Sequence, residues 1–383
     1  MTESATDLLI IGAGPVGLTL AAALADSPWR ITLVDRHPLA GQAADPRALA
    51  LSHGARELLE QLKAWPQRAA TPIETIHVSQ RGGFGRTLMD KAEHGLPALG
   101  YVVRYGDLAA ALRAVLPANC ELLEEAEILA IETDDHTDSE TVTVSLRHHG
   151  EDHRISAGLV IHAEGTPGDD PAVSVSDYHQ HALITEVTVE PGHNRRAWER
   201  FTPDGPLALL PLGEGYSVVF TVPPEKSDRL MAMDDTTFLA ALQAQFGQRL
   251  RFTSVAKRSR FPLALRLRDR LNDGRQAWVG NTAQTLHPVS GQGFNLGLRD
   301  AWELADSLLA GGLAPASLAH YARRRRLDRQ GGAFFTDTIV RAFSNDFAPL
   351  RLVRGLGLFA LDLLPPARHF VAKRMIWGAR AWP

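Results

Sequence analysis

The sequence contains a single cysteine, Cys120, among its 383 residues. One thiol excludes an internal disulfide and any metal site built from paired cysteines. The 15 histidines are scattered without matching partners, so we expect no metal site. The short polar start lacks the basic and apolar regions of a signal peptide, and with the lack of disulfides this favours a cytoplasmic location.

Long apolar runs and an excess of charge of one sign are also missing. No segment holds the roughly 18 apolar residues that a membrane-spanning helix needs. The net charge is -4 at pH 7, so no global basic field favours nucleic acid as a partner. With 45% hydrophobic and 22% charged residues, the chain is predicted to be a soluble globular protein with two domains or one composite domain.

The first forty residues carry a dinucleotide-binding pattern. Residues 7–11 predict a buried strand, and Gly12-Ala-Gly14-Pro-Val-Gly17 follows at once. Residues 18–25 then predict an Ala/Leu helix, and residues 30–34 a second strand. This strand–helix–strand context makes the glycine pattern a specific signal for a bound dinucleotide, either FAD or NAD.

Each position of the pattern has a physical reason. Gly12 allows the tight turn from strand to helix, Gly14 lets a pyrophosphate approach the backbone, and Gly17 lets helix and strand pack closely. Asp35, at the end of the second strand, is placed to accept hydrogen bonds from the ribose hydroxyls. Arg36 either binds a 2′-phosphate or is a solvated residue at the strand end.

A second segment rich in glycine and proline lies near residue 290. Residues 276–280 predict a strand, and helical periodicity begins near residue 301. Between them, Gly291 and Gly293 are predicted to bring free N–H groups to a ligand at a helix N-terminus. The alternative is a long capped turn with Asn295 as a local cap.

The two segments together resemble the class A flavoprotein aromatic hydroxylases. The resemblance is nearest to their ubiquinone-biosynthesis branch, which includes the 2-octaprenyl-6-methoxyphenol hydroxylases. It runs from about residue 5 to the end and is most specific over Gly280-Asn281-Thr-Ala-Gln284 and residues 287–300. Residues 45–52, with Arg47, and residues 101–108, with Arg104, resemble further FAD-contacting segments of the family.

The resemblance implies an α/β fold like that of p-hydroxybenzoate hydroxylase. A Rossmann-like FAD-binding domain is interrupted by an antiparallel-sheet substrate domain and followed by C-terminal helices. The FAD-binding domain is expected to comprise residues 1–70, 101–174 and 266–330. The substrate sheet is expected over 71–100 and 175–265, with strands near 185–189, 207–210 and 216–222, and the helical region over 331–383.

The resemblance also implies roles for individual residues. Arg47 is expected near the pyrophosphate or the flavin, Arg104 near the FAD, and Asn281 beside the ribityl chain. Pro288 would lie against the isoalloxazine ring. Backbone N–H groups are expected to face the pyrimidine edge of the flavin at Gly293, Phe294 and Asn295.

The sequence departs from the family pattern after the strand near residue 160. The family has an Asp-Gly pair there that serves both FAD and NAD(P)H, whereas this chain has Glu164-Gly165. No catalytic base is evident from the sequence. His287 is the one candidate, and a backbone role in its loop is the preferred interpretation.

The resemblance implies an FAD-dependent aromatic monooxygenase that uses NAD(P)H and O2. It would hydroxylate a polyprenylated phenol in ubiquinone biosynthesis through a flavin C4a-hydroperoxide. One alternative is another flavin monooxygenase or reductase with a soluble aromatic substrate. A second alternative, favoured by the altered Glu164 segment, is a non-catalytic member of a quinone-synthesis complex with a weakened cofactor site.

The C-terminal stretch has a basic and apolar composition. Residues 351–383 contain six Lys or Arg and one Asp, interspersed with large apolar side chains. Such a segment is typical of a helix lying on an anionic membrane surface, here the inner face of the membrane. The alternative is an amphipathic helix packed on the FAD-binding domain with its basic face in water.

Overall fold

The computed structural model describes residues 2–83, 85–132, 141–343, 355–357, 359–360 and 362–378. Its first sheet has the strand order β18-β19-β11-β1-β2-β8, with the antiparallel pair β9-β10 added beside β11. The strands are β1 (Thr2–Ile11), β2 (Ile31–Val34), β8 (Cys120–Leu123), β9 (Ala126–Glu132), β10 (Val142–His148), β11 (Glu151–His162), β18 (Asn272–Asp273) and β19 (Gln276–Trp278). From β19 to β8 the neighbouring strands are parallel.

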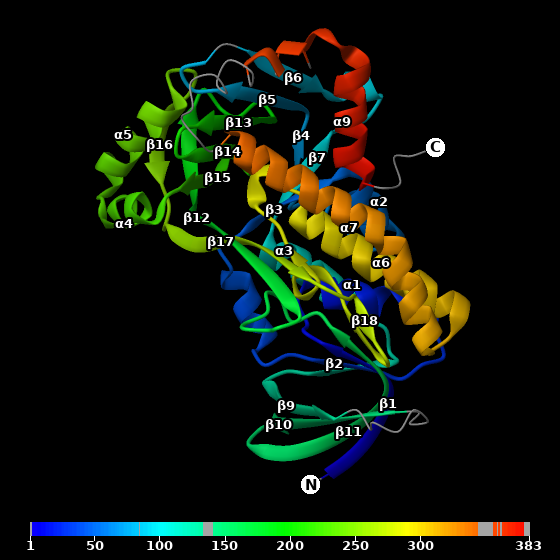
Figure 1. Cartoon of the computed structure of the whole chain (residues 1–383). Coiled ribbons are helices and arrows are strands. Elements are labelled where there is room, and N and C mark those ends of the chain that lie inside the picture. Colours follow the sequence, from blue (N-terminus) through cyan, green and yellow to red (C-terminus); the bar gives the residue numbers. More distant parts are fainter. Residues whose placement is uncertain are drawn as a thin grey trace.

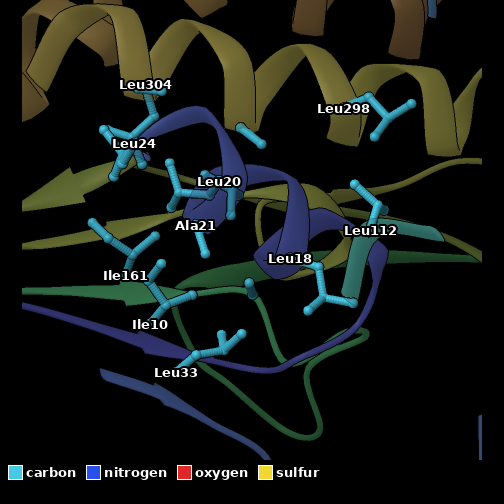
Figure 2. Packing of buried hydrophobic residues seen from close by; sticks show 14 of the residues in the cluster. Ile10, Leu18, Leu20, Ala21, Leu24, Leu33, Leu112, Ile161, Leu298 and Leu304 are labelled. Carbon is cyan, nitrogen blue, oxygen red and sulfur yellow. The ribbon is translucent and has the colours of Figure 1, made fainter. Parts of the chain in front are cut away.

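The core of this domain lies between the sheet and a layer of helices. These helices are α1 (Pro15–Ala23), α3 (Tyr105–Arg113) and α6 (Gly293–Gly311). Figure 2 shows Ile10, Leu33 and Ile161 of the strands facing α1, with Leu298 and Leu304 of α6 on the opposite side of α1. Because α1 is enclosed by the sheet and α6, it is apolar on nearly all sides and almost entirely buried.

A second, mostly antiparallel sheet has the order β20-β17-β12-β15-β14-β13-β5-β6, and β16 pairs with β12. Its strands are β5 (Thr75–Gln80), β6 (Arg86–Asp90), β12 (Val173–Glu190), β13 (Arg196–Thr202), β14 (Gly205–Leu212), β15 (Gly215–Val222), β16 (Arg251–Val255), β17 (Ser259–Arg268) and β20 (Gln284–Thr285). The helices α4 (Pro224–Ala232) and α5 (Asp235–Phe246) cover one face through a shared apolar cluster. The predicted strands near 185, 207 and 216 are confirmed.

A small sheet lies between the two large ones. It has the order β3-β7-β4 and contains β3 (Ala48–Ser52), β4 (Thr71–Ile73) and β7 (Gly100–Arg104). Helix α2 (His53–Gln61) follows β3 directly and is capped by the Ser52 side chain. The small sheet therefore connects the dinucleotide domain to the second sheet.

The C-terminal helices lie along the outside of the molecule. Helix α7 (Pro315–Phe343) runs beside α6, and α9 (Pro365–Trp377) lies near α2, β5 and the edge strand β6 (Figure 1). Ala372 and Ile376 of α9 pack in an apolar cluster with Met89 and Leu99. The parallel sheet, the inserted second sheet and the helices confirm the predicted fold class.

Candidate cofactor and substrate site

Several of the candidate residues predicted from the sequence lie at one edge of the first sheet. In the parallel register Ile11 is opposite both Val34 and His162, and His162 is opposite Trp278. The residues that follow these strand ends therefore meet at the carboxyl edge. The chain leaves β1 toward β2 on one side while β11 lies on the other, and ligands of open α/β sheets bind at such a switch point.

The turn between β1 and α1 is tightly packed at Gly12 and Gly17 but not at Gly14. Gly12 has φ +105°, and a Cβ there would lie 2.5 Å from the carbonyl carbon of Ala163. A Cβ on Gly17 would collide with the Gly12 carbonyl oxygen. At Gly14, by contrast, the nearest atom to a Cβ would be the Tyr105 hydroxyl, at 3.1 Å. Gly12 and Gly17 therefore close the turn, whereas the Cβ position of Gly14 has the Tyr105 hydroxyl as its one neighbour within 4 Å in the described part of the chain.

The start of α1 fits an anion. Gly14 is its N-cap residue, no side chain caps the first turn, and Pro15 has no N–H. The N–H groups of Val16 and Gly17 are therefore available, since Leu18 is the residue whose N–H bonds to the Gly14 carbonyl, at 3.0 Å. Free amides at the positive end of a helix are a binding site for phosphate.

A basic side chain lies beside this helix start. The Arg47 guanidinium stacks 4.6 Å from the ring centroid of Tyr105, whose hydroxyl faces Gly14. Two hydrogen bonds to Asp45, of 2.9 and 2.6 Å, hold the guanidinium in place. Arg47 therefore lies next to the start of α1. Tyr105 was not singled out from the sequence, although it follows Arg104 directly.

Asp35 holds the turn through backbone amides. One carboxylate oxygen accepts from Ala13 N–H at 2.8 Å and the other from His37 N–H at 2.9 Å. Each oxygen keeps a further lone pair that a ribose hydroxyl can use. Arg36 is exposed and borders an open depression of about 480 Å³ whose lining also includes Glu125.

The second helix start is also free of caps. Gln292 is the N-cap of α6, no side chain caps its first turn, and Asn295 lies inside that turn. The Asn295 amide instead donates to the carbonyls of Ala50 (2.9 Å) and Gly291 (2.8 Å), and its oxygen accepts from Ser52 N–H at 2.9 Å. It fastens β3 to this loop, while a Cβ at Gly293 would meet nothing within 4 Å.

The two helix starts converge. A Cβ at Gly297, in the second turn of α6, would lie 3.0 Å from Val16 in the first turn of α1. Gly280 is also close, since a Cβ there would lie 3.2 Å from the same Val16 side chain. This contact puts Gly14 and Gly293 within about one helical turn of the crossing. Strand β3 follows Arg47 directly, and Asn295 at the start of α6 is hydrogen-bonded to its residues Ala50 and Ser52.

His287 is fully buried in the loop before α6. Its Nδ1 accepts from Val289 N–H at 3.1 Å, and the Tyr178 ring packs edge-on at 5.2 Å. Burial lowers the pKa of His287 to about 4, so the ring is neutral. With Nδ1 accepting, Nε2 carries the proton and finds no partner among the described residues. The histidine caps the short turn at Pro288, and neither ring nitrogen offers a free lone pair to a substrate.

Arg104 and Glu164, two of the residues predicted to contact the cofactor, have partners within the protein. Arg104 donates two hydrogen bonds, of 3.1 and 2.7 Å, to the Glu186 carboxylate on the second sheet. The half-exposed Glu164 lies 3.2 Å from the His162 ring nitrogen Nδ1. Gly165 has φ +103° and its Cβ position is open.

Asn281 lies in the turn after β19. Its amide is 3.4 Å from the Thr166 hydroxyl, so the loops after β11 and β19 meet. The preceding Gly280 N–H donates to the buried Asp300 carboxylate at 3.0 Å. Asp300 is itself paired with Arg325 at 2.6 Å. This ion pair fixes the turn and has no local sequence signature, because its partners are 25 residues apart.

The family described as FAD binding domain matches residues 5–331. A ubiquinone hydroxylase of Rhodospirillum rubrum is 33% identical, over 100% of this chain and 92% of that protein. The 3-demethoxyubiquinol 3-hydroxylase of Escherichia coli is 31% identical, over 94% of this chain and 96% of that protein. The crystal structure of p-nitrophenol 4-monooxygenase from Pseudomonas putida superposes with a TM-score of 0.79 at 17% identity, covering 99% and 100% of the two chains, which indicates a shared fold.

Proposed function

This chain belongs to the FAD binding domain family of flavin-dependent oxidoreductases, and from that premise we propose that it hydroxylates a polyprenylated phenol in ubiquinone biosynthesis. The observation that carries the proposal is the convergence of two uncapped helix starts, at Gly14 and Gly293, beside strand β3. Similarity to ubiquinone hydroxylases along the whole chain supports the substrate class.

The residues at the sheet edge fit FAD. The α1 amides and Arg47 would hold the pyrophosphate, and Asp35 the ribose. The amides of α6 after Gly293 would face the acceptor edge of the flavin ring, with Asn281 beside the ribityl chain. When bound, FAD supplies the activation of O2 that ring hydroxylation needs, with NAD(P)H as the reductant. Pro288 and the buried His287 would exclude water from the ring.

We also propose a peripheral contact with the inner face of the membrane. Exposed apolar side chains gather in the C-terminal region, namely Leu356, Phe359, Leu363, Leu364 and Phe370. Lys373 is exposed in α9, the helix that also contains Phe370. Within the described residues no helix is long and apolar enough to cross a bilayer. A surface of this kind would give a polyprenyl substrate a short path from the lipid.

The membrane proposal is tested by sedimentation with anionic vesicles. The double variant Leu363→Asp/Leu364→Asp should lose binding, because two charges would replace apolar side chains that are proposed to contact the lipid. Leu309→Asp, an equally exposed leucine on α6, is the matched control and should still sediment. If the two variants sediment equally, the C-terminal region does not form the membrane contact.

The flavin site is tested with the purified protein. Wild type should be yellow, with an absorbance maximum near ~450 nm. Gly14→Trp should purify folded but without flavin, because the indole fills the space in front of the α1 amides. Gly192→Trp, at an exposed glycine with open space at its Cβ position, is the control and should keep the flavin. A Gly14→Trp protein with full flavin content would refute this placement.

The substrate is tested in a deletion strain. Loss of ubiquinone with accumulation of a prenylated phenol is the expected result. Normal ubiquinone with a flavin-loaded protein would instead favour a soluble aromatic substrate. A wild-type protein that never binds flavin would favour the non-catalytic member of a quinone-synthesis complex.

A further inference from the structure

One row of residues crosses the second sheet and stays partly accessible. Glu199, Ala208, Val219 and Ile184 are direct cross-strand partners on β13, β14, β15 and β12. All four are partly exposed, although their strands are interior strands of the sheet. We call these four residues the accessible row.

The opposite face of the same strands is closed. The residues next to the row along each strand, Trp198, Leu207, Val218 and Leu183, are buried in the cluster under α4 and α5. Since neighbouring side chains on a strand point to opposite faces, the accessibility of the row arises on the other face. That face is incompletely covered by the protein.

The row faces the dinucleotide domain. Glu186, two residues beyond Ile184 and on the same face, is the carboxylate bound by Arg104 of β7. Leu210, two residues beyond Ala208, packs with Val102 of β7. Strand β7 is paired with β3, which Asn295 fastens to the start of α6. The row therefore looks toward the small sheet that borders the proposed flavin site.

Glu199 is the single carboxylate in this otherwise apolar row. Its Oε1 is fully buried and finds no hydrogen-bond partner among the described residues. Burial raises the pKa of Glu199 to about 8, with no neighbouring charge contributing. An unpaired carboxyl in an apolar site is expensive to keep and is typical of a functional position.

We propose that the accessible row lines the phenol-binding site and that Glu199 accepts the hydrogen bond of the phenolic hydroxyl and then its proton. This inference rests on the proposed function. In the step, the phenol O–H bond breaks and its electron pair stays on the phenolate oxygen. A new O–H bond forms on the ionised Glu199 carboxylate, which becomes a neutral carboxylic acid, and no oxidant or reductant takes part. The phenolate ring is richer in electrons and reacts more readily with an electrophilic oxygen.

The row suits the rest of such a substrate as well. Four strands spaced about 4.8 Å apart make it about 14 Å long from Glu199 to Ile184. Ala208, Val219 and Ile184 offer only apolar contacts, which suit the ring and the first part of a prenyl chain. The raised pKa of Glu199 lies within about two of the value near 10 for a phenol, so proton transfer between them is far less uphill than to an ordinary glutamate.

The test uses flavin-loaded protein and 2-geranylphenol as the probe. At about pH 8.5 the free phenol is neutral, because its pKa is near 10. Wild type should bind it and perturb the flavin spectrum, and its kcat should rise as the pH passes about 8, where the Glu199 carboxyl ionises. Glu199→Gln should bind the probe at unchanged flavin content, but its kcat should fall about 100-fold or more and lose this pH dependence. Glu199→Asp should restore part of the activity.

Two further variants keep the test decisive. Glu214→Gln, in the exposed turn between β14 and β15, makes the same chemical change and should behave as wild type. Ala208→Trp fills the row while Glu199 itself is unchanged, and it should weaken probe binding at least about 10-fold, even where Glu199→Gln fails to fold.

The outcomes separate the inference from the proposed function. A wild-type kcat with the wild-type pH dependence in Glu199→Gln, or full binding by Ala208→Trp, would overturn the assignment of the row while leaving the hydroxylase intact. If flavin-loaded wild type neither binds nor hydroxylates the phenol, the proposed function fails and the inference fails with it.

Discussion

Replacing Glu199 by glutamine should change how the stability of the protein depends on pH. The pKa of Glu199 is raised by burial from 4.5 to about 8. Between these values the folded protein retains a proton that the unfolded chain releases. The native state therefore loses stability as pH rises from 4.5 to 8, and the loss is constant above that range. Glutamine has no proton to lose, so the variant lacks this dependence.

The size of the effect follows from the same two pKa values. Each unit of pH across the range changes the free energy of unfolding by about 1.4 kcal/mol. At pH 7 the wild-type carboxyl therefore costs about 3 kcal/mol relative to pH 4.5. The expected result is that Glu199→Gln gains about 3 kcal/mol on wild type between these two pH values, whatever its stability at the lower one.

The assay is urea unfolding of both proteins at pH 4.5, 6, 7 and 8, without substrate. The difference in free energy of unfolding between the variants is plotted against pH, so that contributions from all other groups cancel. Glu214→Gln, whose carboxyl is exposed, should run parallel to wild type. Parallel profiles for wild type and Glu199→Gln would show that the carboxyl ionises freely, and the argument for its burial would be refuted.

Three further predictions concern ion pairs. Arg325→Ala leaves the buried Asp300 and Asp328 without their shared cation and should lower the free energy of urea unfolding by about 3–5 kcal/mol. Arg104→Ala removes a half-exposed pair with Glu186 and should cost less than about 1 kcal/mol in the same assay; a larger loss would contradict its surface character. The pKa of Asp328, lowered to about 2 although burial alone would raise it, is held down by Arg299 and Arg325, so acidification from pH 4 to pH 2 should remove about 2 kcal/mol, a loss absent in Asp328→Asn.

The parts of the site that depend on local sequence could be predicted. Gly12, Gly14 and Asp35 sit in one strand–helix–strand unit, whose geometry follows from residue type and spacing. The loop around Gly293 was recognisable because several unusual backbone positions occur together before a helix. In both cases the candidate residues lie within a short stretch of the chain.

The remaining parts depend on contacts between distant segments. The pairing of Arg104 with Glu186 joins strands 82 residues apart, and no spacing rule predicts it. From the sequence alone, Glu199 cannot be distinguished from an ordinary charged residue of a strand. Its burial follows from the register of β13 with β5, which begins 121 residues earlier, at the pair of Arg196 with Thr75. Only the folded sheet shows that this side chain faces the dinucleotide domain.

The protein buries carboxylates in two different ways, and the contrast bears on function. Asp300 and Asp328 each bind arginine partners, so folding alone accounts for their presence. Glu199 has no such partner among the described residues, and its carboxyl makes the fold less stable near neutral pH. A residue kept at the expense of stability is explained by a ligand that supplies the missing hydrogen bond. A phenolic hydroxyl supplies it, and binding of the phenol should therefore stabilise wild type more than Glu199→Gln.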